Sequence, residues 1–166
     1  MKHLLSVEDL DRIDIERLMD RAASFAEVGR RDIKKVPTLR GRTIVSLFYE
    51  SSTRTSSSFE LAAKRLSADV VSVKSSGSSV DKGESLKDTI ATLSAYSPEV
   101  IVFRHPHAGA AKLITGWTDA AVVNAGDGKH EHPTQALLDV YTLVRKLGSL
   151  EGTKDSRIRS RCMRNA

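Results

Sequence analysis

The sequence predicts an α/β fold in which a parallel sheet of about four strands carries helices on both faces. Two observations favour this class: segments typical of strands and of helices alternate along the chain, and the strand segments are almost continuously apolar. A strand that is apolar on both sides must be buried on both sides, and a parallel sheet between two helical layers achieves this.

The predicted strands are four short segments in which apolar and β-branched residues predominate. A buried parallel strand needs such a run, because its side chains face a helical layer on either side. The four segments are Thr43–Tyr49, Asp69–Val73, Glu99–Phe103 and Ala121–Asn124.

The predicted helices show apolar residues at spacings of three and four. The first is expected to begin at Ser6, which with Asp9 has the spacing of a capping box, and to stop at Gly29. The last has Pro133 in its first turn and Gly148 just beyond its end. The four helices that follow the first are Ser56–Ser67, Ser85–Tyr96, Ala108–Trp117 and Pro133–Leu147.

Length and composition bound the class of protein. The chain has 166 residues, of which 40% are apolar and 28% charged, a balance typical of one globular domain. A collagen-like chain, low-complexity disorder and a disulfide scaffold are excluded, the last because Cys162 is the only cysteine. No apolar run approaches the roughly 18 residues of a membrane helix and no signal peptide is visible, so we expect a cytoplasmic protein without a membrane partner.

Basic residues are concentrated at the C-terminal end. The net charge of +5 comprises 26 Lys and Arg against 21 Asp and Glu, and residues 154–166 alone contribute five cations and one acid. We therefore expect a domain over residues 1–152, almost neutral, and an atypical basic tail over residues 153–166. Such a tail gives only salt-sensitive, non-specific attraction to a polyanion, so we expect no nucleic-acid partner.

Polar side chains follow three of the predicted strands. After the first, residues 50–55 (Glu-Ser-Ser-Thr-Arg-Thr) open a helix, and hydroxyls, N–H groups and a guanidinium at a helix N-terminus are the chemistry of a phosphate site. Arg104 follows the third strand, and His132 and Gln135 stand at the start of the helix after the fourth. Because the carboxyl ends of parallel strands share one edge, we expect Arg54, Arg104 and His132 to converge on a small phosphate compound with a polar carbonyl.

Each of these segments also has a plainer explanation. A Ser/Thr helix cap beside a solvated arginine accounts for residues 50–55, a surface arginine for Arg104, and a capping or core histidine for His132. Residues 75–82, rich in Ser and Gly, are expected to form a flexible loop. Residues 130–132 (His-Glu-His) are not expected to bind a metal, because no third ligand has convincing spacing.

Several ordered segments resemble the signature motifs of the carbamoyltransferase family. The three main motifs are residues 52–55 (Ser-Thr-Arg-Thr, followed by Phe59-Glu60), 104–106 (Arg-His-Pro) and 132–135 (His-Pro-Thr-Gln). Residues 80–89 and 132–139 are similar to the aspartate rather than the ornithine members. The resemblance spans about residues 3–152 and departs from the family at Ser56, where an arginine is usual.

The resemblance implies a role for each matching side chain. The first motif, Ser52-Thr53-Arg54-Thr55, would hold the phosphate oxygens of carbamoyl phosphate, and Arg104 would bridge its phosphate and carbonyl. His132, together with Thr55, would contact the carbonyl oxygen, and Gln135 would contact the carbamoyl amide. These donors would stabilise the charge that grows on the carbonyl and on the leaving phosphate, a scheme that requires no metal or redox cofactor.

The loop that carries Lys82 and Ser79 (or Ser78, which aligns equally well) is implied to approach both ligands. In the family this loop reaches into the active site of a neighbouring subunit. The resemblance therefore implies a homotrimer with shared active sites.

The family also implies two domains, the first for carbamoyl phosphate and the second for the amino-acid acceptor. This chain resembles the first and then stops, so we expect the aspartate-binding domain to be absent and the L-aspartate site to be incomplete. The implied parent reaction converts carbamoyl phosphate and L-aspartate to N-carbamoyl-L-aspartate and phosphate in pyrimidine biosynthesis. We expect the chain itself to bind carbamoyl phosphate with little or no turnover. Two alternatives stay open: an ornithine carbamoyltransferase, and a non-catalytic, trimerising module that binds a phosphate metabolite.

Overall fold

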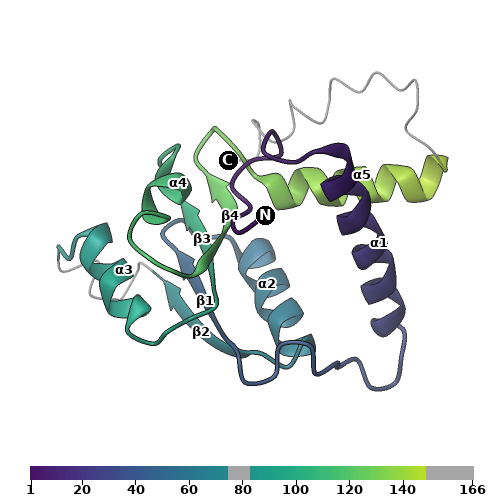
Figure 1. The fold of residues 1–166 in the computed structure, drawn as a ribbon, viewed down its shortest axis with the longest axis horizontal. Helices are drawn as coiled ribbons and strands as arrows, with labels where there is room; N and C mark the ends of the chain where they lie inside the picture. Colours follow the sequence, from purple (N-terminus) through teal and green to yellow (C-terminus); the bar gives the residue numbers. More distant parts are fainter. Residues whose placement is uncertain (75–82, 149–166) are drawn as a thin grey trace.

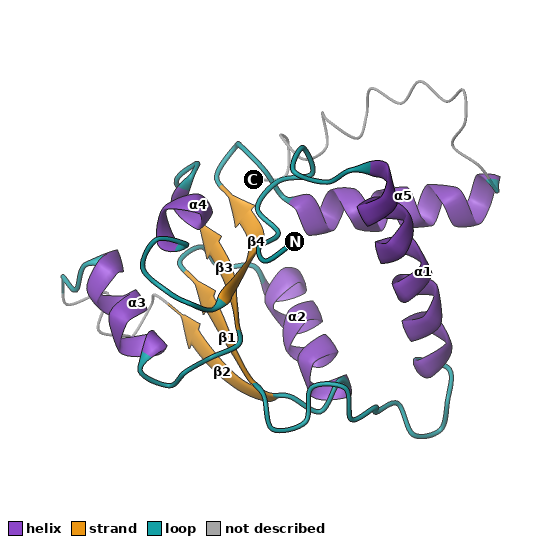
Figure 2. Ribbon diagram, viewed as in Figure 1, coloured by secondary structure: helices purple, strands orange, loops and turns teal. Residues whose placement is uncertain are grey.

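The computed structural model describes residues 1–74 and 83–148. Its strands form one sheet in the order β2-β1-β3-β4, and all three neighbouring pairs run parallel (Figure 2). The predicted α/β class and the four-stranded parallel sheet are thereby confirmed. The strands are β1 (Thr43–Phe48), β2 (Asp69–Lys74), β3 (Val100–His105) and β4 (Ala121–Asp127).

Helices cover both faces of the sheet, as the apolar strands require. Figure 1 shows α3 and α4 on one side and α2 and α5 on the other, with α1 packed against α5. The helices of the described part are α1 (Arg12–Val28), α2 (Thr53–Arg65), α3 (Leu86–Ser94), α4 (Ala110–Ile114) and α5 (Pro133–Leu147). None of these helices is both long and apolar enough to cross a membrane.

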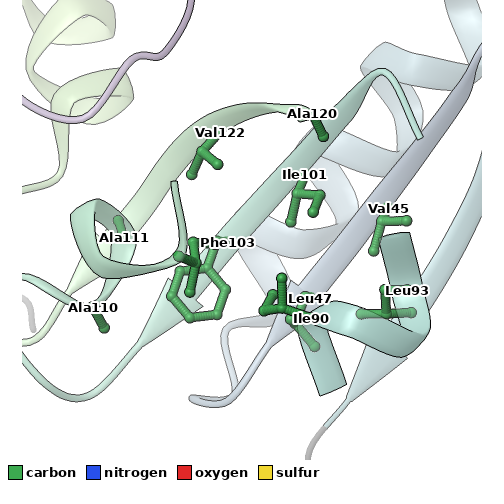
Figure 3. Packing of buried hydrophobic residues seen from close by; sticks show 11 residues of the cluster. Val45, Leu47, Ile90, Leu93, Ile101, Phe103, Ala110, Ala111, Ala120 and Val122 are labelled. Carbon is green, nitrogen blue, oxygen red and sulfur yellow. The ribbon is translucent and has the colours of Figure 1, made fainter. Parts of the chain in front are cut away.

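The larger apolar cluster lies between the sheet and the α3–α4 layer (Figure 3). Leu47 of β1, Phe103 of β3 and Ile90 of α3 are completely buried in it. Leu93, one helical turn after Ile90, is also buried, so these two residues form the inward face of α3. Side chains of this size gain about 1.5–3 kcal/mol each on full burial, which makes this cluster a main source of stability.

A second apolar cluster lies on the opposite face, under α2. Ile44 and Phe48 of β1 point into it, whereas Val45 and Leu47 of the same strand point into the first cluster. This alternation is the physical reason that the strand is a continuous apolar run.

The first helix does not begin where the sequence predicted. It starts at Arg12, because the Asp11 carboxylate caps it by accepting from the Asp14 N–H at 2.7 Å. Ser6 instead donates its hydroxyl hydrogen to Glu131 at 3.0 Å. Leu4 pairs with the edge of β4, in an isolated parallel bridge to Val123. The capping-box prediction was wrong, because Ser6 is engaged by Glu131 and residues 7–10 form a turn before the helix begins.

Other boundaries shifted by a few residues. Helix α2 begins at Thr53, three residues earlier than predicted, and α4 is shorter at both ends than predicted. Strands β3 and β4 continue to His105 and Asp127, which face each other across the ladder. Arg104 therefore lies inside a strand rather than after it. The predictions for residues 75–82 and 153–166 lie outside the described residues.

Candidate active site

The carboxyl ends of the strands border a cavity of about 760 Å³ between α2 and α5. Six of the side chains predicted to form the site line it: Ser52, Arg54, Thr55, Arg104, His132 and Gln135. Thr53 is exposed beside the cavity and is not part of its lining. Lys82, Ser79 and Ser78 lie outside the described residues.

The N-terminus of α2 opens into this cavity. Ser52 precedes the helix in an extended conformation, but its side chain does not cap the helix. The Ser52 hydroxyl donates instead to the Thr55 hydroxyl oxygen at 2.9 Å. The N–H groups of the first turn therefore keep their capacity to donate to an anion, at the positive end of the helix dipole.

Ser56 stands where the family usually has an arginine. Its hydroxyl donates to the Ser52 carbonyl at 2.8 Å, so it contributes to the first turn of α2. Its side chain adds no positive charge at this end of the cavity.

Arg104 brings a buried positive charge to the cavity. Its side chain, 7% exposed, extends from β3, with Nη2 2.9 Å from a Glu50 carboxylate oxygen. Nη1 donates to the Ala125 carbonyl at 3.0 Å, whereas Nε has no acceptor among the described residues. These two contacts fix the plane of the guanidinium and leave further N–H donors for a ligand.

Gly126 is the reason that Arg104 fits. Its φ of +118° is a conformation that side-chain-bearing residues rarely adopt, and a Cβ there would lie 2.4 Å from Arg104 Nη1. The same Cβ would lie 3.6 Å from the His132 ring. Sequence reasoning did not foresee this close approach of Gly126 to Arg104.

His132 occupies the N-cap position of α5, at the edge of the cavity. Burial and the Arg104 charge lower its pKa to about 4, so the ring is neutral at pH 7. The Thr134 hydroxyl oxygen lies 3.2 Å from Nδ1 of this ring. A neutral imidazole can donate one hydrogen bond without adding charge to the site.

Gln135 and Asp139 lie one turn apart along the cavity wall formed by α5. The Gln135 amide nitrogen donates to the Asp139 carboxylate at 3.0 Å. Glu50 and Asp139 are the carboxylates found here that sequence reasoning did not single out. Glu50 stands two residues before Ser52, and nothing in the sequence indicated its contact with Arg104.

Residues 130–132 separate in the structure. His130 Nδ1 lies 3.2 Å from the Asp127 carboxylate, whereas the Glu131 carboxylate accepts from the Ser6 hydroxyl. Within residues 1–74 and 83–148, no three His, Cys, Asp or Glu side chains gather as metal ligands would.

Comparison with known proteins explains this constellation. Residues 2–145 match the family described as "Aspartate/ornithine carbamoyltransferase, carbamoyl-P binding domain". The chain belongs to the aspartate/ornithine carbamoyltransferase family. The match includes every described residue that lines the cavity.

Relatives of this chain are catalytic subunits of aspartate carbamoyltransferases. The one from Acidothermus cellulolyticus is 58% identical over 154 residues, which are 93% of this chain and 48% of the relative. The one from Clavibacter sepedonicus is 59% identical over 149 residues, or 89% of this chain and 47% of the relative. The chain thus spans about half the length of the curated relatives it matches.

Solved structures agree with these relatives. The catalytic subunit of M. jannaschii aspartate transcarbamoylase superposes with a TM-score of 0.84 at 43% identity, covering 92% of this chain and 49% of that one. The Trypanosoma cruzi aspartate transcarbamoylase, in complex with carbamoyl phosphate and aspartate, gives a TM-score of 0.84 at 40% identity, covering 91% and 49%. The chain therefore has the fold of the amino-terminal, carbamoyl-P binding half of aspartate carbamoyltransferase catalytic subunits.

Replacing Gly126 tests the geometry under Arg104. We expect Gly126→Ala to displace the guanidinium and to weaken the binding of a small phosphate ligand, with carbamoyl phosphate as the probe, by about tenfold or more, because small misplacements at a site are costly. Gly116→Ala is the matched control, since its new Cβ would meet only the Leu113 carbonyl oxygen, at 3.7 Å. Calorimetric titration measures both, and equal affinities for Gly126→Ala and wild type would contradict this account.

The low pKa of His132 predicts a pH dependence of stability. Between its ordinary pKa of 6.5 and the folded value of about 4, the unfolded chain binds more protons than the folded chain. The free energy of unfolding should therefore fall as the pH drops from 6.5 to about 4. Above pH 6.5 the ring is neutral in both states, so His132 should cause no loss of stability there. Proton NMR should find the His132 ring still neutral at about pH 5.5, and titration near its ordinary value would contradict the burial described here.

Proposed function

We propose that the cavity binds carbamoyl phosphate and that the chain supplies the carbamoyl phosphate half of an aspartate carbamoyltransferase active site. The observation that carries this proposal is the convergence of Arg54 from α2, Arg104 from β3 and His132 from the start of α5 on one cavity. Such a cavity offers cations and neutral donors together, as a small phosphate compound with a carbonyl group requires. Membership of the family supports the same ligand.

The phosphate would lie at the N-terminus of α2. There the first-turn N–H groups, the Ser52 and Thr55 hydroxyls and the Arg54 guanidinium face the cavity. Backbone donors and a helix dipole favour an anion at this position, and an arginine adds charge-assisted hydrogen bonds.

The carbamoyl group would lie toward Arg104 and His132. Attack by an amine places negative charge on the carbonyl oxygen, and donors already in place stabilise that charge. Arg104 is held by Ala125 and Glu50 before any ligand arrives, so little reorganisation is needed. Thr55 adds a hydroxyl beside this oxygen, and the Gln135 side chain would receive the carbamoyl amide.

We propose L-aspartate as the acceptor and a homotrimer as the assembly that completes the site. The unprotonated amine of L-aspartate attacks the carbamoyl carbon, and the bond between that carbon and the bridging oxygen breaks. Phosphate leaves and takes up the proton that the amine loses, so N-carbamoyl-L-aspartate and hydrogen phosphate form. Lys82 and Ser79 would enter the active site of a neighbouring subunit. The parent activity would serve pyrimidine biosynthesis in the cytoplasm, where the single cysteine stays reduced.

Arg54 offers the most direct test of carbamoyl phosphate binding. We expect calorimetry to detect binding to the 166-residue chain and Arg54→Ala to weaken it by about ten- to a hundredfold, since a charge-assisted hydrogen bond contributes about 1.5–3 kcal/mol. Arg31→Ala, at an exposed position beyond α1, is the control and should bind as wild type does. Unchanged binding by Arg54→Ala would remove this residue from the site.

Turnover tests the acceptor half. The 166 residues match only about half of the length of their relatives, so the other half is not there to hold the acceptor. We therefore expect the 166-residue chain alone to form little N-carbamoyl-L-aspartate. The full-length Acidothermus cellulolyticus relative is the positive control, assayed with aspartate and with ornithine. A robust rate from the 166 residues alone would refute this part of the proposal.

The mass of the protein in solution tests the proposed homotrimer. Light scattering coupled to gel filtration should report three times the chain mass of 18.2 kDa. A monomer at all accessible concentrations would contradict a trimer built from these residues.

A further inference from the structure

Asp127 is a buried carboxylate that adjoins the cavity without lining it. It is 2% exposed and lies at the end of β4 between Gly126 and Gly128, both of which do line the cavity. A buried carboxylate is costly unless its oxygens receive hydrogen bonds, so its partners indicate what it does.

The Asp127 carboxylate receives donors from two different crossovers. One oxygen accepts the Gly109 N–H at 2.8 Å, from the connection between β3 and α4. The other accepts the Glu131 N–H at 2.9 Å, from the connection between β4 and α5. The Asn124 side-chain amide also donates to this carboxylate, at 3.2 Å. His130 Nδ1 lies 3.2 Å from it.

Backbone hydrogen bonds make this carboxylate the centre of a closed turn. The Asp127 N–H donates to the Glu131 carbonyl at 3.1 Å, and the Gly128 N–H donates to the His105 carbonyl at 2.9 Å. Asn124 also accepts the Gly126 N–H at 2.9 Å. The turn thus fixes Gly126, directly beneath Arg104, and Glu131, directly before His132.

We propose that Asp127 is the positioning residue of the carbamoyl phosphate pocket: its carboxylate ties the two crossovers together and so sets where His132 and Arg104 stand. This rests on the function proposed above. The role needs a carboxylate, because both of its oxygens must accept hydrogen bonds: one from the Gly109 N–H, the other from the Glu131 N–H and the Asn124 amide. An asparagine would turn its own NH₂ group toward one of the two backbone N–H donors.

The test compares Asp127→Asn with Asp119→Asn, an exposed position between α4 and β4. In folded Asp127→Asn we expect carbamoyl phosphate affinity to fall by about tenfold or more, and Asp127→Ala to lose more still. The pKa of His132, followed by NMR without ligand, should rise from about 4 toward 6.5 as the ring becomes solvated. Asp119→Asn should change neither quantity.

These readouts separate positioning from general stability. If folded Asp127→Asn keeps both the wild-type affinity and the wild-type His132 pKa, the proposal is overturned. If the wild-type chain binds no carbamoyl phosphate, the proposed function fails, whereas the ligand-free His132 titration still decides the role of Asp127.

A measurement on the wild-type chain keeps the proposal testable if Asp127→Asn does not fold. Coupling between sites is reciprocal, so a network that positions the pocket must be stabilised when the pocket is filled. Saturating carbamoyl phosphate should slow hydrogen exchange at the Gly109 and Glu131 amides together. Unchanged exchange at both amides in the saturated protein would overturn the proposal.

Discussion

The buried Arg104 guanidinium constrains everything around it. A cation with this little exposure must be paired, and it obtains Glu50 on one side and the Ala125 carbonyl on the other. It also needs space, which only a residue without a Cβ at Gly126 provides. Its charge in turn helps to keep His132 neutral. The sheet order β2-β1-β3-β4 places β3, which carries Arg104, between the strands that lead to the other two site segments.

Much of the architecture could be predicted from the sequence, because parallel strands covered on both faces leave a distinctive pattern. The bounds of α5 were correct, since Pro133 and Gly148 act locally at its two ends. The start of α1 was wrong, since Ser6 is engaged by Glu131, 125 residues away, and local spacing carries no information about such a contact. The lengths of β3 and β4 were underestimated for a related reason: ladder pairing between His105 and Asp127 extends strands past the apolar run.

The candidate site could likewise be predicted only in part. Arg54, Arg104 and His132 could be proposed together because strand ends in a parallel sheet share one edge. Three contributions could not be foreseen: the Glu50 pair, the close approach of Gly126 to Arg104, and the Asp127 network. Each depends on side chains or backbone brought together from different strands and connections. The roles of Lys82 and Ser79 stay predictions from the resemblance.

The location of the bound phosphate group is the most direct test of this account. NMR chemical shifts should be followed in the isotope-labelled chain while carbamoyl phosphate is added, with inorganic phosphate as a second probe. The account predicts that the largest changes fall on the amides of residues 53–55 and on the Nε–H of Arg104. Changes centred instead on the exposed basic stretch of residues 30–42, with the α2 N-terminus and Arg104 unaffected, would contradict it.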